Sequence, residues 1–134
     1  MATCNIIFAR CLWRVGMVLF FLLYAGSGPA GAHSVVVESS PKDKEVLTHA
    51  PKEVMLRFNA RIEKSLTRIS LVTSEGRKIP LPVPPGNYGG DSPDRVIIPL
   101  PHLVLGNYLL HYKVLSTDGH ATSGVLRFSI VGAP

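Results

Sequence analysis

The alternation of apolar and polar side chains constrains the fold of this chain more than any other feature. The alternation is clearest over 54–58, 108–114 and 125–131, and shorter stretches of it cover 66–72 and 96–98. Successive side chains of a β-strand point to opposite faces of a sheet, so a two-residue period indicates strands that bury one face. No stretch of ordinary helix length has the 3.6-residue period of a helix.

Turn-forming residues separate these stretches. Ser74-Glu75-Gly76 ends the second one, and a segment rich in Pro and Gly covers 82–94. We expect that segment to be a loop without strand pairing, because Pro lacks the N–H that a ladder needs. Short strands at this spacing predict an all-β, immunoglobulin-like sandwich of two antiparallel sheets with about seven strands. The residues expected in its core are Val54, Leu56, Phe58, Leu71, Ile98, Tyr108, Leu110, Tyr112, Val114, Phe128 and Ile130.

The first 32 residues have the three-part order of a secretory signal. Arg10 and Arg14 precede an apolar run over 17–24, and the segment ends on Ala30-Gly31-Ala32. The run is far shorter than the roughly 20 residues that a membrane-spanning helix needs, which favours cleavage over an uncleaved anchor. The two arginines are not adjacent, which favours the general secretory route over the twin-arginine route. We therefore expect 1–32 to be a cleaved signal peptide and 33–134 to be one domain exported to the periplasm.

Composition limits what the exported domain can be. Both cysteines, Cys4 and Cys11, lie in the signal, so the remaining chain of about 100 residues can form no disulfide and depends on its core. The chain has 14 Lys and Arg against 9 Asp and Glu, and two of those cations belong to the signal. A positive charge this small and this scattered argues against nucleic acid as a partner.

Cleavage after Ala32 would make His33 the first residue, and a terminal histidine offers a metal both its α-amine and its imidazole. Asp118-Gly119-His120 offers two more donors, because Gly119 lets the side chains on either side of it turn to the same side of a loop. Asp-Gly is also an ordinary hairpin turn in which the aspartate bonds its own backbone. Since the first strand of a sandwich can lie close to such a loop, His33, Asp118 and His120 are the candidate metal ligands.

These residues supply three nitrogens and one oxygen, a donor set that suits Cu(II) better than Zn(II). The α-amine has a reference pKa of about 8, so it loses its proton to a metal more easily than a lysine amine does. Cu(I) prefers sulfur, and Met55 is the one methionine that follows the signal. We therefore expect one Cu(II) per chain and no methionine-rich Cu(I) site.

Several stretches, in this order and spacing, resemble the CopC family of periplasmic copper-resistance proteins. They are His33 with Ser39-Ser40-Pro41, the 50–59 segment APKEVMLRFN, Leu105-Gly106-Asn107-Tyr108, and the 114–120 segment VLSTDGH with Ser123-Gly124 and Phe128. The resemblance implies a small Greek-key β-sandwich that binds one Cu(II) through the terminal amine, the first histidine and the Asp and His of the last loop. Those roles fall on His33, Asp118 and His120 here. The partner that it implies is an inner-membrane copper protein of the CopD kind.

Two features depart from the family pattern. Some members carry a glutamate where this chain has Ala60, and Glu63 is out of register with that position. The carboxylate that supports the copper ligands from outside in those members therefore has no counterpart at residue 60. Other members carry a Met and His cluster for Cu(I) in the middle loop, whereas 79–94 contains neither residue. The second departure again favours a one-site Cu(II) form.

The remaining histidines are expected to be surface or hydrogen-bonded residues rather than ligands. His49 precedes a proline turn, His102 follows Pro101, and His111 shares a strand face with Lys113. Tyr88, in the Pro- and Gly-rich loop, is expected to be solvated.

The favoured function is that of a monomeric Cu(II)-binding protein, not an enzyme, that serves copper resistance, storage or transfer to a membrane transporter. A copper monooxygenase also uses a terminal histidine to chelate copper. Asp118 beside His120 would fill the copper plane in which such an enzyme binds oxygen, and no flat aromatic platform for a polymer is evident. A third alternative is a sandwich interaction module that binds no metal.

Overall fold

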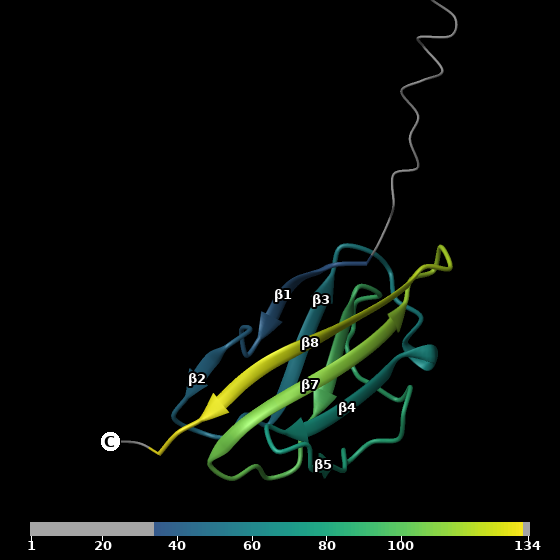
Figure 1. Cartoon of the computed structure of the whole chain (residues 1–134). Helices are drawn as coiled ribbons and strands as arrows, with labels where there is room; N and C mark the ends of the chain where they lie inside the picture. Colours follow the sequence, from purple (N-terminus) through teal and green to yellow (C-terminus); the bar gives the residue numbers. More distant parts are fainter. Residues whose placement is uncertain (1–33, 133–134) are drawn as a thin grey trace, which may run out of the picture. The chain divides into compact units, whose positions relative to one another are not determined.

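The computed structural model describes residues 34–132, which form two β-sheets packed face to face (Figure 1). The three-stranded sheet has the order β1-β3-β6, and the five-stranded sheet has the order β2-β8-β7-β4-β5. The strands are β1 (Val36–Ser40), β2 (Glu45–Leu47), β3 (Glu53–Phe58), β4 (Arg68–Thr73), β5 (Lys78–Ile79), β6 (Arg95–Pro99), β7 (Gly106–Leu115) and β8 (Ala121–Ile130). The predicted all-β sandwich is confirmed, with eight strands rather than about seven.

Strands β7 and β8 are the longest, and they form the centre of the five-stranded sheet. They pair without interruption from Gly106 opposite Ile130 to Leu115 opposite Ala121. Tyr108 stacks on Phe128 with 5.4 Å between ring centroids, and its hydroxyl donates to the carbonyl oxygen of Val104 at 2.7 Å. These contacts anchor one end of the hairpin. The turn over 116–120 lies at its other end.

The core between the sheets contains all the predicted residues except Tyr112, which is half-buried with its ring edge against Phe58. It also contains Tyr88, which is 7% exposed and accepts a hydrogen bond from the N–H of Ile69 at 3.2 Å. The prediction that Tyr88 is solvated was wrong, because its loop folds back over the sandwich. Gly89 in the same loop exchanges two backbone hydrogen bonds with Ile97, so the loop also pairs with a strand. Further buried residues outside the predicted core list are Ile62, Val96, Leu100, Leu103 and Leu126.

Two strands were not predicted, and one pairing differs from the expected pattern. β1 and β2 precede the first alternating stretch, and β2 pairs with β8 in parallel rather than antiparallel. Leu66 lies not in a strand but in η1 (Lys64–Leu66), a single 3-10 turn before β4. No helix within 34–132 is long and apolar enough to cross a membrane.

Three segments meet at one end of the sandwich. They are the start of β1, the connection that follows β3, and the turn between β7 and β8 (Figure 1). The N–H of Asn59 donates to the carbonyl oxygen of Val35 at 3.0 Å, and the N–H of Thr117 donates to that of Arg61 at 3.0 Å. The connection after β3 therefore contacts both the entry of the chain and the β7–β8 turn.

Candidate metal centre

The β7–β8 turn, residues 116–120, is closed by hydrogen bonds within its own backbone. The N–H of Ser116 donates to the carbonyl oxygen of His120, and the N–H of Gly119 donates to that of Ser116, both at 2.9 Å. Gly119 has a φ of 90°, a value that favours glycine over any residue with a side chain. The turn therefore depends on the glycine that separates the two predicted ligands.

Asp118 Oδ1 is the polar centre of this turn. It accepts hydrogen bonds from the Ser116 hydroxyl and from the backbone N–H of His120 (3.1 Å), and it lies 3.2 Å from His120 Nδ1. These contacts lower the pKa of Asp118 to about 2, with the Ser116 hydroxyl as the largest cause, then the His120 backbone, then the His120 ring. Asp118 is consequently an anion at neutral pH, which is the form that binds a cation.

Asp118 and His120 are both open to solvent, with 41% and 54% of their side chains exposed. The structure thus brings these two predicted ligands together, one oxygen donor and one imidazole. It also shows Asp118 bonded to its own turn, as in an ordinary hairpin. The two descriptions are compatible, because a carboxylate that caps a turn is held in place for a second partner.

Ser116, Asp118 and His120 do not form a nucleophile with its base. Ser116 is 1% exposed, and its hydroxyl donates to the carboxylate rather than to the imidazole. An activated serine needs its proton on the imidazole side and an open approach for a substrate. The turn therefore offers ligands rather than a nucleophile.

His33, the third predicted ligand, lies outside the described residues. Ser34, the residue next to it, is completely buried, and the N–H of Val35 donates to Asn59 Oδ1 at 2.8 Å. Between Ser34 and Gly132 no group of three or more His, Cys, Asp or Glu could hold a metal ion. The described chain thus supplies Asp118 and His120, and completion of the site by His33 stays a prediction.

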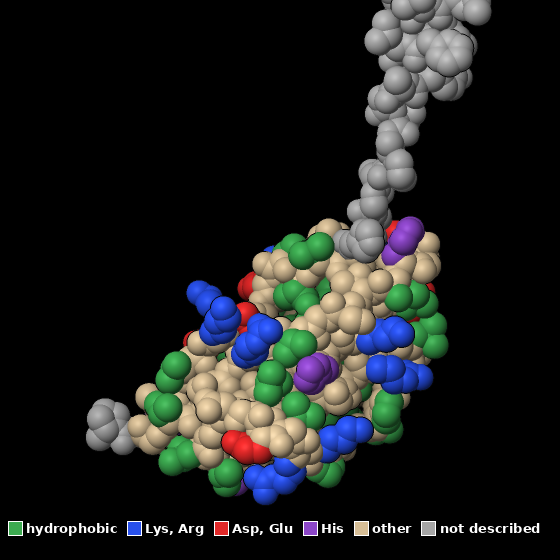
Figure 2. Space-filling model, in the orientation of Figure 1, with side chains coloured by type: hydrophobic (Ala, Val, Ile, Leu, Met, Phe, Trp, Pro, Cys, Tyr) green, Lys and Arg blue, Asp and Glu red, His purple; other side chains and the backbone are tan. Residues whose placement is uncertain are grey.

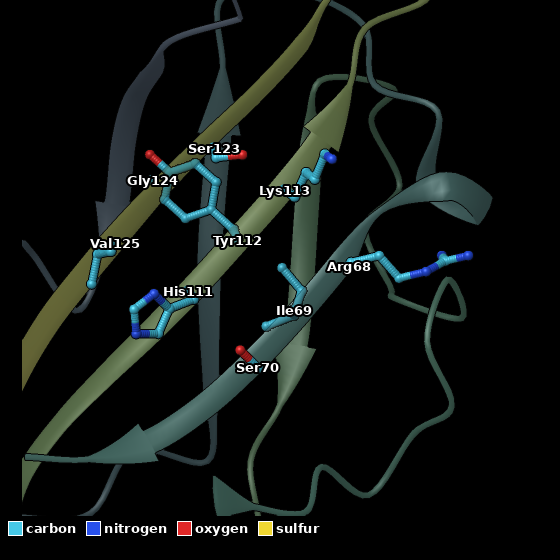
Figure 3. A pocket seen from close by; sticks show the side chains of 9 residues that line it. All are labelled: Arg68, Ile69, Ser70, His111, Tyr112, Lys113, Ser123, Gly124 and Val125. Atoms are coloured by element: carbon cyan, nitrogen blue, oxygen red, sulfur yellow. The ribbon is translucent and has the colours of Figure 1, made fainter. Parts of the chain in front are cut away.

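His111 lies on the outer face of the five-stranded sheet, opposite Ser70 and Val125 on the neighbouring strands. It lines an open hollow of about 470 Å³ together with Arg68 and Lys113 (Figure 3). No carboxylate lines this hollow, and the face in view carries many Lys and Arg side chains (Figure 2). This environment repels a cation rather than binding one.

His49 and His102 lie at the other end of the sandwich, in the connections β2–β3 and β6–β7. They line a shallow hollow of about 400 Å³, and His49 Nδ1 lies 2.9 Å from the hydroxyl of Thr48. β3 runs from this end to Phe58, next to Asn59, so the length of β3 separates both histidines from the β7–β8 turn.

Two residues that shape the site were missed by the sequence reasoning. Ser116 stands two residues before Asp118, and a hydroxyl at that spacing before an Asp-Gly turn is a signal that was available. Asn59 contacts Val35 across 24 positions of the sequence, and no local pattern reports such a contact.

Comparisons with known proteins identify the family of this chain. The model of the CopC domain family matches residues 36–131. Copper resistance protein C of Xanthomonas campestris pv. juglandis is 31% identical over 111 residues, which cover 78% of this chain and 84% of that protein. Copper transport protein CutJ of Bacillus subtilis is 28% identical over 122 residues, which cover 90% of this chain. The chain spans 22% of the length of that second relative.

Solved structures share the sandwich. CopC from Methylosinus trichosporium OB3b has a TM-score of 0.67 at 30% identity, and the match covers 76% of this chain and 97% of that one. PcoC, a methionine-rich copper resistance protein from Escherichia coli, has a TM-score of 0.63 and covers 75% and 100%, but at 23% identity it shows the fold alone. CopC-family proteins are periplasmic copper-binding proteins without an enzymatic activity. With a family model matched over nearly all of its described residues, this chain belongs to the CopC family of copper-resistance proteins.

Proposed function

We propose that this protein binds one Cu(II) per chain through the α-amine and imidazole of His33, the carboxylate of Asp118 and the imidazole of His120. The observation that carries the proposal is the Asp118–His120 pair, 3.2 Å apart on a solvent-open turn at the end of the sandwich where the chain enters. The described chain begins at the same end of the sandwich as this turn (Figure 1), which supports completion of the site by His33.

The donor chemistry supports Cu(II) as the bound state. Nitrogen and carboxylate ligands in a tetragonal set suit Cu(II), whereas Cu(I) prefers thioether or thiolate sulfur. Met55 is the one sulfur-bearing residue after the signal, and it lies in the middle of β3. A relative described as methionine-rich therefore has a ligand supply that this chain lacks.

Export and copper transfer complete the proposal. Residues 1–32 are removed as a Sec-type signal, and the domain over 33–134 works in the periplasm as a monomer. It holds Cu(II) for resistance or storage, or passes it to an inner-membrane copper protein of the CopD kind. The name of the Bacillus subtilis relative, a copper transport protein more than four times as long as the matched region, supports a role next to a transporter.

Intact mass measurement of the exported protein tests the cleavage and the stoichiometry together. We expect a mass that begins at His33 and one added copper after incubation with Cu(II). A protein that begins at any other residue, or that retains no copper, would contradict the proposed ligand set. Absence of copper retention would instead favour a sandwich module without a metal.

Histidine variants test which side chains bind the ion. His120→Ala should weaken Cu(II) binding by more than the roughly 10–100-fold cost of losing an outer-shell partner, because it removes a ligand. His111→Ala is the matched control, since it removes an exposed imidazole from a hollow that no carboxylate lines. Equal losses in both variants, measured by competition with a chelator, would point to different ligands.

A further inference from the structure

The connection that follows β3 joins the two halves of the proposed copper site. On one side, Asn59 bonds Val35, which stands two residues after His33. On the other side, the carbonyl oxygen of Arg61 accepts the N–H of Thr117, and Ile62 forms a backbone bridge with Ser116. Four consecutive residues thus fix both segments that carry the proposed ligands.

Asn59 holds Val35 with its side chain as well as with its backbone. Its Oδ1 accepts the N–H of Val35 at 2.8 Å, and its own N–H donates to the carbonyl oxygen of Val35 at 3.0 Å. This is the pattern of one more ladder pair, placed before β1 begins at Val36. The Asn59 side chain therefore extends the hydrogen bonding of the sheet by one residue, from Val36 to Val35, toward the start of the exported chain.

Because His33 is only two residues from Val35, the hydrogen bonds to Val35 also restrict the position of His33. Neighbouring Cα atoms are about 3.8 Å apart, and two residues span at most about 7 Å. Ser34 is completely buried, so the residue that joins Val35 to His33 has little freedom of its own. Fixing the backbone at Val35 therefore limits the volume that the His33 amine and imidazole can occupy.

We propose that Asn59 is a positioning residue for copper: it places the amino-terminal ligand beside Asp118 and His120 by bonding the backbone of Val35. The inference rests on the proposed function. Without this bond the terminal residues would sample more conformations, and the conformational entropy lost in ordering them would weaken copper binding. With this bond, the terminal residues are already ordered when the domain folds.

The test compares three variants of the exported protein. Asn59→Ala removes the acceptor, and Asn59→Asp keeps an oxygen that can accept the same hydrogen bond. Asn107→Ala is the matched control, because Asn107 also accepts a side-chain hydrogen bond, from Ser129 at 2.7 Å, at the opposite end of β7. Asn59 and Asn107 are both exposed, so each replacement leaves the core intact.

We expect Asn59→Ala to weaken Cu(II) binding by about three- to tenfold, the equivalent of one net hydrogen bond. Its Cu(II) EPR spectrum should show a second population in which the terminal nitrogens no longer coordinate. Asn59→Asp should restore most of the affinity and a single spectrum, and Asn107→Ala should behave like the natural protein. In the copper-free state, the Val35 amide should exchange its hydrogen faster in Asn59→Ala than in Asn59→Asp.

Two results would overturn the inference. One is an Asn59→Ala protein with faster Val35 exchange but unchanged affinity and spectrum, which would make the bond purely structural. The other is an Asn59→Asp protein that restores Val35 protection without restoring the affinity. In either case, copper binding that still depends on His120 would leave the proposed function standing, whereas copper binding independent of His120 would remove both.

Discussion

Asp118 closes the β7–β8 turn and, in our proposal, also binds the metal. Its Oδ1 collects a hydroxyl, a backbone N–H and an imidazole nitrogen within five residues of sequence. Each of these donors stabilises the ionised carboxylate, which is why its pKa falls to about 2. The turn therefore presents a charged oxygen before any metal arrives.

This pKa shift predicts how the copper-free protein responds to acid. The folded-state pKa of Asp118 lies below its ordinary value of 3.8, so folding favours the ionised form. The resulting stabilisation is complete above about pH 4 and is lost as the pH falls from 4 toward 2. Between those values, the free energy of unfolding should fall more steeply in the natural protein than in Asp118→Asn.

Ser116→Ala provides the matched test, because the Ser116 hydroxyl is the largest cause of the shift. An NMR titration of the Asp118 carboxyl should give a higher pKa in this variant than in the natural protein. An unchanged pKa would mean that the turn backbone, not the hydroxyl, holds the charge.

At the residue scale, the sequence predicted pairs of side chains that are close in sequence better than contacts between distant residues. Asp118 and His120 could be paired because their spacing around Gly119 is local. The solvation expected for Tyr88 was wrong because a buried tyrosine inside a Pro- and Gly-rich loop has no periodic neighbours to reveal it. Its partner, the N–H of Ile69, becomes a neighbour only after the loop folds back.

At the element scale, the β7–β8 hairpin contains an aromatic ring that covers a glycine. Tyr112 lies opposite Gly124 in the register, and a Cβ at residue 124 would overlap the phenol end of the Tyr112 ring. The same ring packs edge-on against Phe58 with 5.9 Å between centroids. Glycine at 124 therefore lets the ring lie across the strand and reach the opposite sheet.

Gly124→Ala should consequently destabilise the fold by about 1–3 kcal/mol, the usual cost of overpacking. Ser123→Ala, on the exposed face of the same strand, should change the free energy of unfolding by less than about 0.5 kcal/mol. A double variant with Tyr112→Leu should recover part of the loss, because the two changes share one contact. Urea unfolding of all the variants measures this coupling, and simple additivity would exclude the clash.

The strands that the sequence missed lack the signal that revealed the others. β1 begins inside a run of three consecutive valines, Val35 to Val37, and its register shifts between Val36 and Glu38. β2 has three residues and is held by a parallel pairing with the end of β8. Alternation reports strands with one regular buried face, and neither of these has one.

At the scale of the whole molecule, the core is complete without metal. The buried cluster runs from Val54 to Ile130 and includes residues of both sheets. The copper-free protein should therefore stay folded. The proposed site lies at one end of the sandwich, where binding adds to stability without creating the fold.

Copper should raise the stability by mass action, by about 2.7 kcal/mol when free metal is 100 times the dissociation constant. For a domain of about 100 residues, this corresponds to a rise in Tm of roughly 10 to 20 °C. Calorimetry with and without Cu(II), followed by a chelator, measures the shift and its reversal. An unfolded copper-free protein, or a His120→Ala protein with the full shift, would contradict this account.

The short connection after β3 also determines when copper can bind, because it contacts two distant segments of the chain. It stands 24 residues from the segment it holds on one side and more than 50 from the segment on the other. A polypeptide that is still threading through a translocation channel has not yet brought those distant parts together. In our proposal, metal loading therefore follows export and cleavage, and a molecule that holds copper has already folded.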